Sequence, residues 1–241
     1  MAKKNIKELI IAGDSWGCGA WSTAISNNMP ADNYLTESFS KWFNVTNLSA
    51  GGESNSGIYR NLRSYFNTRT RTSIKDMTIL VIQTEPSRDI FFRIDWFLKN
   101  PKCKIFEKVD FKEYCETVIN LYYYNLNALA IDYGVIINVT GGCSDVDDAI
   151  ISKYSNLNVV CSSFYKLIDA DHQSNITSAT FQVEKLLTSF SKNNLVVTSA
   201  AVAKNKIQWD YRENYFGWYP DNHPSKKGID IWVDHMYNKL V

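Results

Sequence analysis

The sequence is poor in several features, and each scarcity excludes a class of protein. It has no run of about 20 apolar residues, so a membrane-spanning helix is excluded. Its 26 basic and 25 acidic residues give a net charge of +1, so the charge balance does not indicate a nucleic-acid partner. Its five cysteines are scattered, without Cys-x-x-Cys or metal-ligand spacing. We therefore expect reduced thiols and no bound metal.

Targeting and linker signals are also missing from the chain. The first residues are charged and lead into an apolar run, without a cleavable signal segment, so we expect a cytoplasmic location. No repeat, low-complexity tract or linker divides the 241 residues. A chain of this length can bury a large core, and we expect one domain over 1–241.

Short apolar runs alternate with longer helical stretches along the chain. The predicted strands, rich in Val, Ile and Leu as buried strands are, are Glu8–Ala12, Phe43–Leu48, Thr78–Gln83, Val135–Val139 and Leu195–Ser199. The predicted helices are Asn33–Trp42, Ser56–Asn67, Phe111–Tyr133, Ala179–Ser191 and Lys226–Lys239. This order predicts an α/β fold, a three-layer αβα sandwich with a parallel sheet of about five strands. Two segments outside the alternation are expected to be insertions, at about 87–110 and 141–178.

The run Ile10-Ile11-Ala12-Gly13-Asp14-Ser15 carries a serine where a buried strand gives way to a predicted helix. At such a turn the backbone N–H groups point outward, and the helix dipole favours negative charge. Ser15 is therefore a candidate nucleophile whose surroundings suit an oxyanion. The alternative is that Asp14 or Ser15 only caps the helix.

A serine nucleophile needs a base, and the chain has three histidines, His172, His223 and His235. His223 lies on the loop that opens the last predicted helix, two residues after Asp221, whose carboxylate could orient the imidazole. His172 also follows aspartates but precedes the last predicted strand, and His235 lies within a predicted helix. These contexts favour His223 as the base.

Another candidate segment follows the second predicted strand, where residues 47–55 read Asn-Leu-Ser-Ala-Gly-Gly-Glu-Ser-Asn. Glycines directly after a strand allow backbone N–H groups to approach a ligand closely. We therefore expect this loop to lie beside the turn that carries Ser15, since both follow parallel strands.

These segments, in this order, resemble the sequence blocks of the SGNH hydrolases, also called the GDSL esterase/lipase family. Residues 13–19 resemble the first block, GDSxxxG, and residues 47–54 resemble the second block, whose glycine falls on Gly52. Asp221 and His223 resemble the last block. The resemblance implies that Ser15 is the nucleophile, His223 the base and Asp221 the acid, with no cofactor. It also implies an oxyanion hole that includes the N–H groups of Ser15 and Gly52.

The chain departs from the family pattern in two places. The third block, GxND, supplies an asparagine to the oxyanion hole, but here the third strand runs into Thr84-Glu85-Pro86. Gln83 and Thr84 are nearest in register as replacement donors; otherwise the hole has two donors. The last block reads Asp-x-His in place of Asp-x-x-His, so a backbone carbonyl is an alternative to Asp221 for orienting His223.

The resemblance implies a serine esterase that hydrolyses a small acyl ester through an acyl-enzyme intermediate. Aromatic residues at 209–219, next to His223, favour an acetyl ester on a carbohydrate as the substrate. The expected partners are a small-molecule or carbohydrate ester, with no nucleic acid and no membrane span. The alternatives are an acyltransferase or thioesterase on the same scaffold, or a non-catalytic binding or structural module with a degenerate site. The missing third block favours the non-catalytic alternative.

Overall fold

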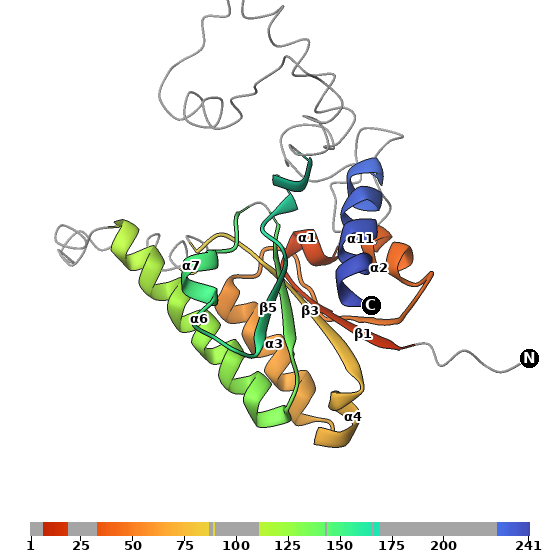
Figure 1. Ribbon diagram of the computed structural model, residues 1–241, viewed down its shortest axis with the longest axis horizontal. Helices are drawn as coiled ribbons and strands as arrows, with labels where there is room; N and C mark the ends of the chain where they lie inside the picture. Colours follow the sequence, from red (N-terminus) through yellow and green to blue (C-terminus); the bar gives the residue numbers. More distant parts are fainter. Residues whose placement is uncertain are drawn as a thin grey trace, which may run out of the picture.

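Five parallel strands form a single sheet in the order β2-β1-β3-β4-β5 (Figure 1). The computed structural model describes residues 7–18, 33–86, 89, 111–142, 144–164, 166–168 and 226–241. The strands are β1 Glu8–Ala12, β2 Asn44–Asn47, β3 Met77–Gln83, β4 Ile137–Gly141 and β5 Leu157–Cys161. This strand order is that of flavodoxin-like doubly wound sheets, and it confirms the predicted α/β class.

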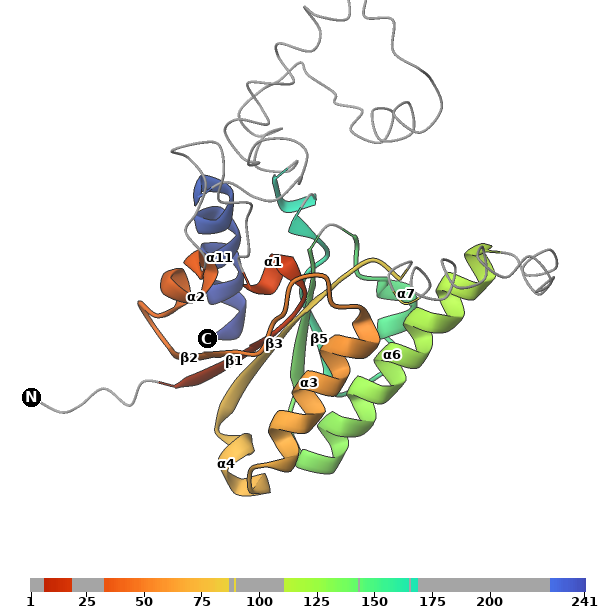
Figure 2. The same cartoon turned by 180° about the vertical axis from the view of Figure 1, so that it is seen from behind.

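Helices cover both faces of the sheet (Figures 1 and 2). The helices are α1 Ser15–Cys18, α2 Tyr34–Phe39, α3 Asn55–Asn67, α4 Arg71–Lys75, α6 Phe111–Tyr133, α7 Asp148–Ile151 and α11 Lys226–Leu240. The helices α2 and α11 lie together on one face, and α3 and α6 lie on the other. The described part of the chain is therefore a three-layer arrangement.

Alternation along β1 divides the core between the two faces. Leu9 and Ile11 pack with the α2 and α11 side, whereas Ile10 and Ala12 pack with the α3 and α6 side, and all four are fully buried. Such a run of apolar residues is required of a central strand that is covered on both faces. Burial on both faces therefore holds β1 in place within the sheet. Because Ser15 follows the end of β1, the same packing also positions Ser15.

Aromatic rings anchor the short helix α1 to the C-terminal helix. The Trp16 ring lies 5.6 Å from Phe164 and 6.5 Å from Trp232, measured between ring centroids, and the Phe164 and Trp232 centroids are 5.5 Å apart. The three rings meet at tilted or edge-on angles, which suits their quadrupoles. Residues near both ends of the chain thus pack together beneath the turn that carries Ser15.

The main difference from the predicted elements is the fifth strand. β5 lies at Leu157–Cys161, inside the segment 141–178 that was expected to be an insertion, and the prediction of no strand there was wrong. As an edge strand, β5 buries only Val160 and Cys161 fully, so it lacks the continuous apolar run that marks the central strands. The strand predicted at 195–199 and the helix at 179–191 lie outside the described residues.

Candidate active site

Ser15 lies at the carboxyl edge of the sheet, where the strands end. It is half-buried and is the first residue of α1, which follows β1. The loop after β2 and Thr84 after β3 end at the same edge, because the strands are parallel and β1 lies between β2 and β3. The structure therefore gathers the segments that carry Ser15, Gly52, Gln83 and Thr84 on one edge of the sheet (Figure 1).

Asp14 is fully buried and holds the turn in front of Ser15. Its Oδ1 accepts a hydrogen bond from the Trp16 backbone N–H at 2.9 Å, and its Oδ2 accepts one from the Thr84 hydroxyl at 2.8 Å. A buried carboxylate is tolerable only when such donors replace water. Asp14 thus caps α1, as the alternative interpretation of the sequence allowed, and also ties that turn to the end of β3.

Asn55, the first residue of α3, is a site residue that the sequence did not single out. It is fully buried, its Oδ1 accepts from the Thr84 N–H at 3.0 Å, and its Nδ2 donates to the Thr84 carbonyl at 2.9 Å. The pair of bonds clamps the start of α3 to the end of β3. An asparagine at a helix start after a Gly-Gly loop was the only signal in the sequence, and it also fits an ordinary cap.

Thr84 therefore stands between two buried partners. Its hydroxyl has one hydrogen, and two carboxylates lie within bonding distance, Asp14 Oδ2 at 2.8 Å and Glu85 Oε2 at 2.7 Å. The chain Asn55–Thr84–Asp14, called here the edge network, connects the loops after β1, β2 and β3. The hydroxyl of Thr84 is engaged in this network, and its predicted part in the oxyanion hole stays a prediction.

Gln83, the last residue of β3, supports a different loop. Its Nε2 donates to the Asp145 carbonyl at 2.9 Å, and its Oε1 accepts from the Tyr123 hydroxyl at 2.6 Å. The Asp147 N–H in turn donates to the Tyr123 hydroxyl at 3.3 Å. Gln83 thus holds the loop between β4 and α7, and its predicted role as an oxyanion donor also stays a prediction.

The loop after β2 lies directly against α1. The Ala50 N–H donates to the Gly13 carbonyl at 3.1 Å, and the Asn47 Nδ2 donates to the Gly17 carbonyl at 2.8 Å. A Cβ at Gly17 would collide with the Ser49 hydroxyl, so a larger residue there would force the Ser49 side chain to move. Contact between the first and second candidate segments is therefore a property of the fold.

Gly52 has the left-handed backbone conformation that favours glycine, with φ of 77°. The residue is exposed, and open space surrounds the position that a Cβ would take. No described residue accepts a hydrogen bond from its N–H. Any residue other than glycine would be strained in this conformation.

Two tyrosines of α6 are buried beneath this edge. Burial raises the pKa of Tyr122 well above its usual value, and Tyr123, Asp89 and Asp14 raise it further. Burial likewise raises the pKa of Tyr123, the hydroxyl of which bonds to Gln83. Both phenols are therefore neutral at physiological pH and are unsuited to act as bases there.

His223, Asp221, the alternative base His172 and Gly19 lie outside the described residues. His235 lies on α11, as expected of a helix residue, and is half-buried. α11 begins at Lys226, three positions after His223 in the sequence, and its first turn lies on the side of the sheet where the strands end (Figures 1 and 2). The start of α11 therefore lies on the same side of the sheet as Ser15.

The described part of the chain has neither a metal-binding cluster nor a membrane-spanning helix. There, no group of three or more His, Cys, Asp or Glu side chains is arranged to hold a metal ion. The helices of the same residues include none that is both long and apolar enough to cross a bilayer.

Comparison with known proteins gives structural matches alone. Neither a protein-family profile nor a curated protein sequence matches the chain. Solved structures that resemble it include AlinE4, titled an SGNH-hydrolase family esterase, with a TM-score of 0.38, 11% identity, and coverage of 85% of this chain and 98% of that one. An aspartate-to-alanine mutant of the same esterase has a TM-score of 0.38, 12% identity, and coverage of 84% and 98%. A serine-to-alanine mutant has a TM-score of 0.36, 10% identity, and coverage of 87% and 95%.

Proposed function

We propose that this chain is a serine hydrolase that cleaves small acyl esters, with Ser15 as the nucleophile and His223 as the base. The observation that carries the proposal is the position of Ser15 at the start of α1, in a turn fixed by the buried edge network of Asp14, Thr84 and Asn55. A nucleophile must be held in one geometry to gain from proximity, and buried hydrogen bonds provide such rigidity.

In the proposed reaction, His223 takes the hydroxyl proton of Ser15 as the serine oxygen attacks the ester carbonyl. The negative charge that develops on the carbonyl oxygen is stabilised by the N–H groups of Ser15 and Gly52. His223 then protonates the departing alcohol. A water molecule, deprotonated by His223, releases the acid from Ser15, and Asp221 orients the imidazole throughout.

The proposed oxyanion hole has two backbone donors. Thr84 and Gln83, the nearest candidates for a third, already bond to Asp14 and to Asp145 and Tyr123. Loss of one oxyanion donor typically lowers kcat by about 100-fold or more. We therefore infer a slower enzyme than one with three donors.

The proposed substrate is an acetyl ester on a carbohydrate. The aromatic residues at 209–219, which directly precede the proposed acid and base, are suited to stack against a sugar ring. Transfer of the acyl group to an added sugar alcohol, measured as product partitioning against hydrolysis, distinguishes an acyltransferase from an esterase on this scaffold.

Hydrolysis of p-nitrophenyl acetate tests the proposal. We expect S15A and H223A to lower kcat/KM by about 1,000-fold or more, because each removes a member of the nucleophile–base pair. H172A is the matched control and should stay within about threefold of the parent. The proposal would be falsified if S15A, folded by circular dichroism, retained the parental rate.

A non-catalytic module is the second candidate function, favoured by the engagement of Thr84 and Gln83 in structural bonds. It predicts that the parent hydrolyses p-nitrophenyl esters no faster than S15A does, whatever the length of the acyl group. It also predicts that the parent binds the intact carbohydrate ester without turnover. The parent–S15A difference therefore separates the two candidates.

A further inference from the structure

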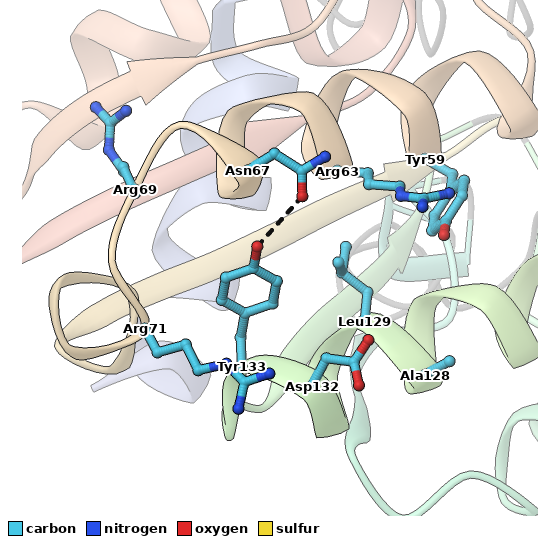
Figure 3. A pocket seen from close by; sticks show the side chains of 9 residues that line it. All are labelled: Tyr59, Arg63, Asn67, Arg69, Arg71, Ala128, Leu129, Asp132 and Tyr133. Carbon is cyan, nitrogen blue, oxygen red and sulfur yellow. Dashed lines mark hydrogen bonds between the residues drawn. The ribbon is translucent and has the colours of Figure 1, made fainter.

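A cleft of about 440 Å³ opens between the helices α3, α4 and α6 (Figure 3). α3 starts beside Thr84 at the carboxyl edge and ends at Asn67, shortly before α4 and the start of β3. The cleft is lined by α3 from Tyr59 onward, by Arg69 between α3 and α4, by the start of α4 and by the last turns of α6. It therefore lies at the amino edge and is separate from the candidate active site.

Positive charge is concentrated around this cleft. The segment 55–76 has five basic residues and one acidic residue, although the whole chain carries a net charge of only +1. Three of these basic residues, Arg63, Arg69 and Arg71, line the cleft, together with a single carboxylate, Asp132. No ion pair with another described residue is formed by Arg63, Arg71 or Asp132.

The arginines are not all used in the same way. The guanidinium of Arg69 stacks over the Tyr65 ring at 3.8 Å, and Figure 3 shows it pointing away from Tyr133. Arg63 and Arg71 come from α3 and α4, and the α6 residues Asp132 and Tyr133 lie between them in that view. Arg63 and Arg71 are both exposed. The guanidinium groups of Arg63 and Arg71 are therefore the ones with hydrogen-bond donors available for a ligand.

Helix dipoles do not explain these two arginines. A cation stabilises a helix in its last turn, but the last turn of α3 has no basic residue, so Arg63 lies outside it. Arg71 is the first residue of α4, the end at which a helix dipole disfavours a cation. Neither position is therefore explained by the helix dipole.

The walls of the cleft are ordered and rich in donors. The Tyr133 hydroxyl donates to the Asn67 Oδ1 at 3.3 Å, and the Tyr133 ring packs edge-on against Phe66 at 4.9 Å. This bond leaves both hydrogens of the Asn67 amide as donors beside the guanidinium groups. Such a surplus of donors suits a ligand that offers only acceptors, and guanidinium groups suit phosphate or carboxylate oxygens.

We propose that the cleft between α3, α4 and α6 binds a small multiply charged anion bearing phosphate or carboxylate groups, through Arg63 and Arg71. This site goes beyond the proposed hydrolase function and does not depend on it. The donor chemistry is common to phosphates and carboxylates, so the two sources are separated by experiment.

The test is calorimetric titration of the full chain with pyrophosphate and, separately, with citrate, at ionic strength held constant with NaCl. We expect saturable binding with a dissociation constant of about 1 mM or tighter for at least one of them. The combined R63Q and R71Q variant should bind about tenfold or more weakly, because it removes both charge-assisted donors. The matched control R60Q, exposed on the same helix but outside the cleft, should stay within about threefold of the parent.

The variant D132N gives a test that misfolding cannot imitate. It removes the one carboxylate of the cleft and should tighten anion binding by about threefold. Saturation by pyrophosphate alone assigns a phosphate ligand, and saturation by citrate assigns recognition of carboxylates or of charge. No saturable binding by either anion overturns the proposal, as does an equal loss in R60Q and the double variant. Labelling of Ser15 by a fluorophosphonate is measured in the same variants and should equal that of the parent. The anion-binding proposal and the hydrolase proposal can therefore fail separately.

Discussion

The two edges of the sheet use polar residues in opposite ways. At the carboxyl edge, Asp14, Asn55 and Thr84 are fully buried and bonded to one another. At the amino edge, Arg63 and Asp132 are exposed and form no ion pair with described residues. Burying a polar group costs free energy unless each donor and acceptor is satisfied, whereas an exposed charge costs little.

The two arrangements suit different functions. A satisfied buried network has one low-energy arrangement and fixes the backbone around it, which is what a nucleophile needs. Exposed guanidinium groups can rearrange to meet an anion, which is what a binding cleft needs. The helix α3 contributes to both edges, with the buried Asn55 at its start and the exposed Asn67 at its end.

The largest expected difference is in the free energy of unfolding, between variants that remove Asp14 at the carboxyl edge and Asp132 at the amino edge. D14A should lower the free energy of unfolding by about 3 kcal/mol, because it removes the buried acceptor of the Trp16 N–H bond and one of the two carboxylates that lie within bonding distance of the Thr84 hydroxyl. D132A, at the exposed edge, should change it by less than about 0.5 kcal/mol. Urea unfolding followed by fluorescence measures both, and equal effects would show that the buried carboxylate stabilises the fold no more than the exposed one.

The asparagines at the two ends of α3 provide the next comparison. N55A removes two buried hydrogen bonds to Thr84 and should cost about 2 kcal/mol, whereas N67A removes one exposed bond and should cost less than about 0.5 kcal/mol. N55A should also slow ester hydrolysis, because it releases the end of β3 from the start of α3. A loss in N67A as large as that in N55A would show that the bonds to Thr84 carry no special weight.

A smaller effect is expected from neighbouring tyrosines beneath the carboxyl edge. Y123F leaves the Gln83 Oε1 without its donor and should cost about 1 kcal/mol. Y122F should cost less than about 0.5 kcal/mol at neutral pH, since no described residue bonds to the buried Tyr122 hydroxyl. Thermal unfolding at pH 7 shows which of the two variants is less stable. If Y122F were less stable than Y123F, this would argue against a stabilising role for the hydrogen bond between Tyr123 and Gln83.

The same tyrosines predict the smallest effect, a dependence on alkaline pH. Burial raises the pKa of Tyr122 in the folded protein, while an unfolded tyrosine ionises at about pH 10. The folded state therefore binds more protons above that pH, so stability is complete below it and falls as the pH rises toward the folded pKa. Y122F removes one such group and should make the loss between about pH 9 and about pH 11.5 shallower. An unchanged slope, measured by urea unfolding across that range, would contradict the buried neutral phenol.

The elements that could be predicted from the sequence are those with one strong local signal. β1 and α6 have the predicted bounds, because a continuous apolar run and a long helical stretch each specify their element locally. β5 was missed because an edge strand needs few apolar residues, and its pairing with β4 is decided by the sheet. The short helices α4 and α7 were missed because each is a single turn fixed by a cap, Thr70 or Asp147.

The site divides in the same way. The position of Ser15 after β1 follows from a motif and a buried strand, and Asp14 was considered as a helix cap from its position alone. The bonds of Thr84 to Asp14 and Asn55 join residues 70 and 29 positions apart in the sequence. Only the strand order brings these residues together, so no local pattern could have predicted them.

Covalent labelling tests the central claim, that the carboxyl edge holds Ser15 as an activated nucleophile. The full chain is incubated with a fluorophosphonate, and the adduct is located by peptide mass spectrometry. The account predicts one adduct on Ser15 that S15A abolishes and H223A slows by about 100-fold or more, while H172A labels at the parental rate. An unlabelled chain, or an adduct on another serine that persists in S15A, would contradict it.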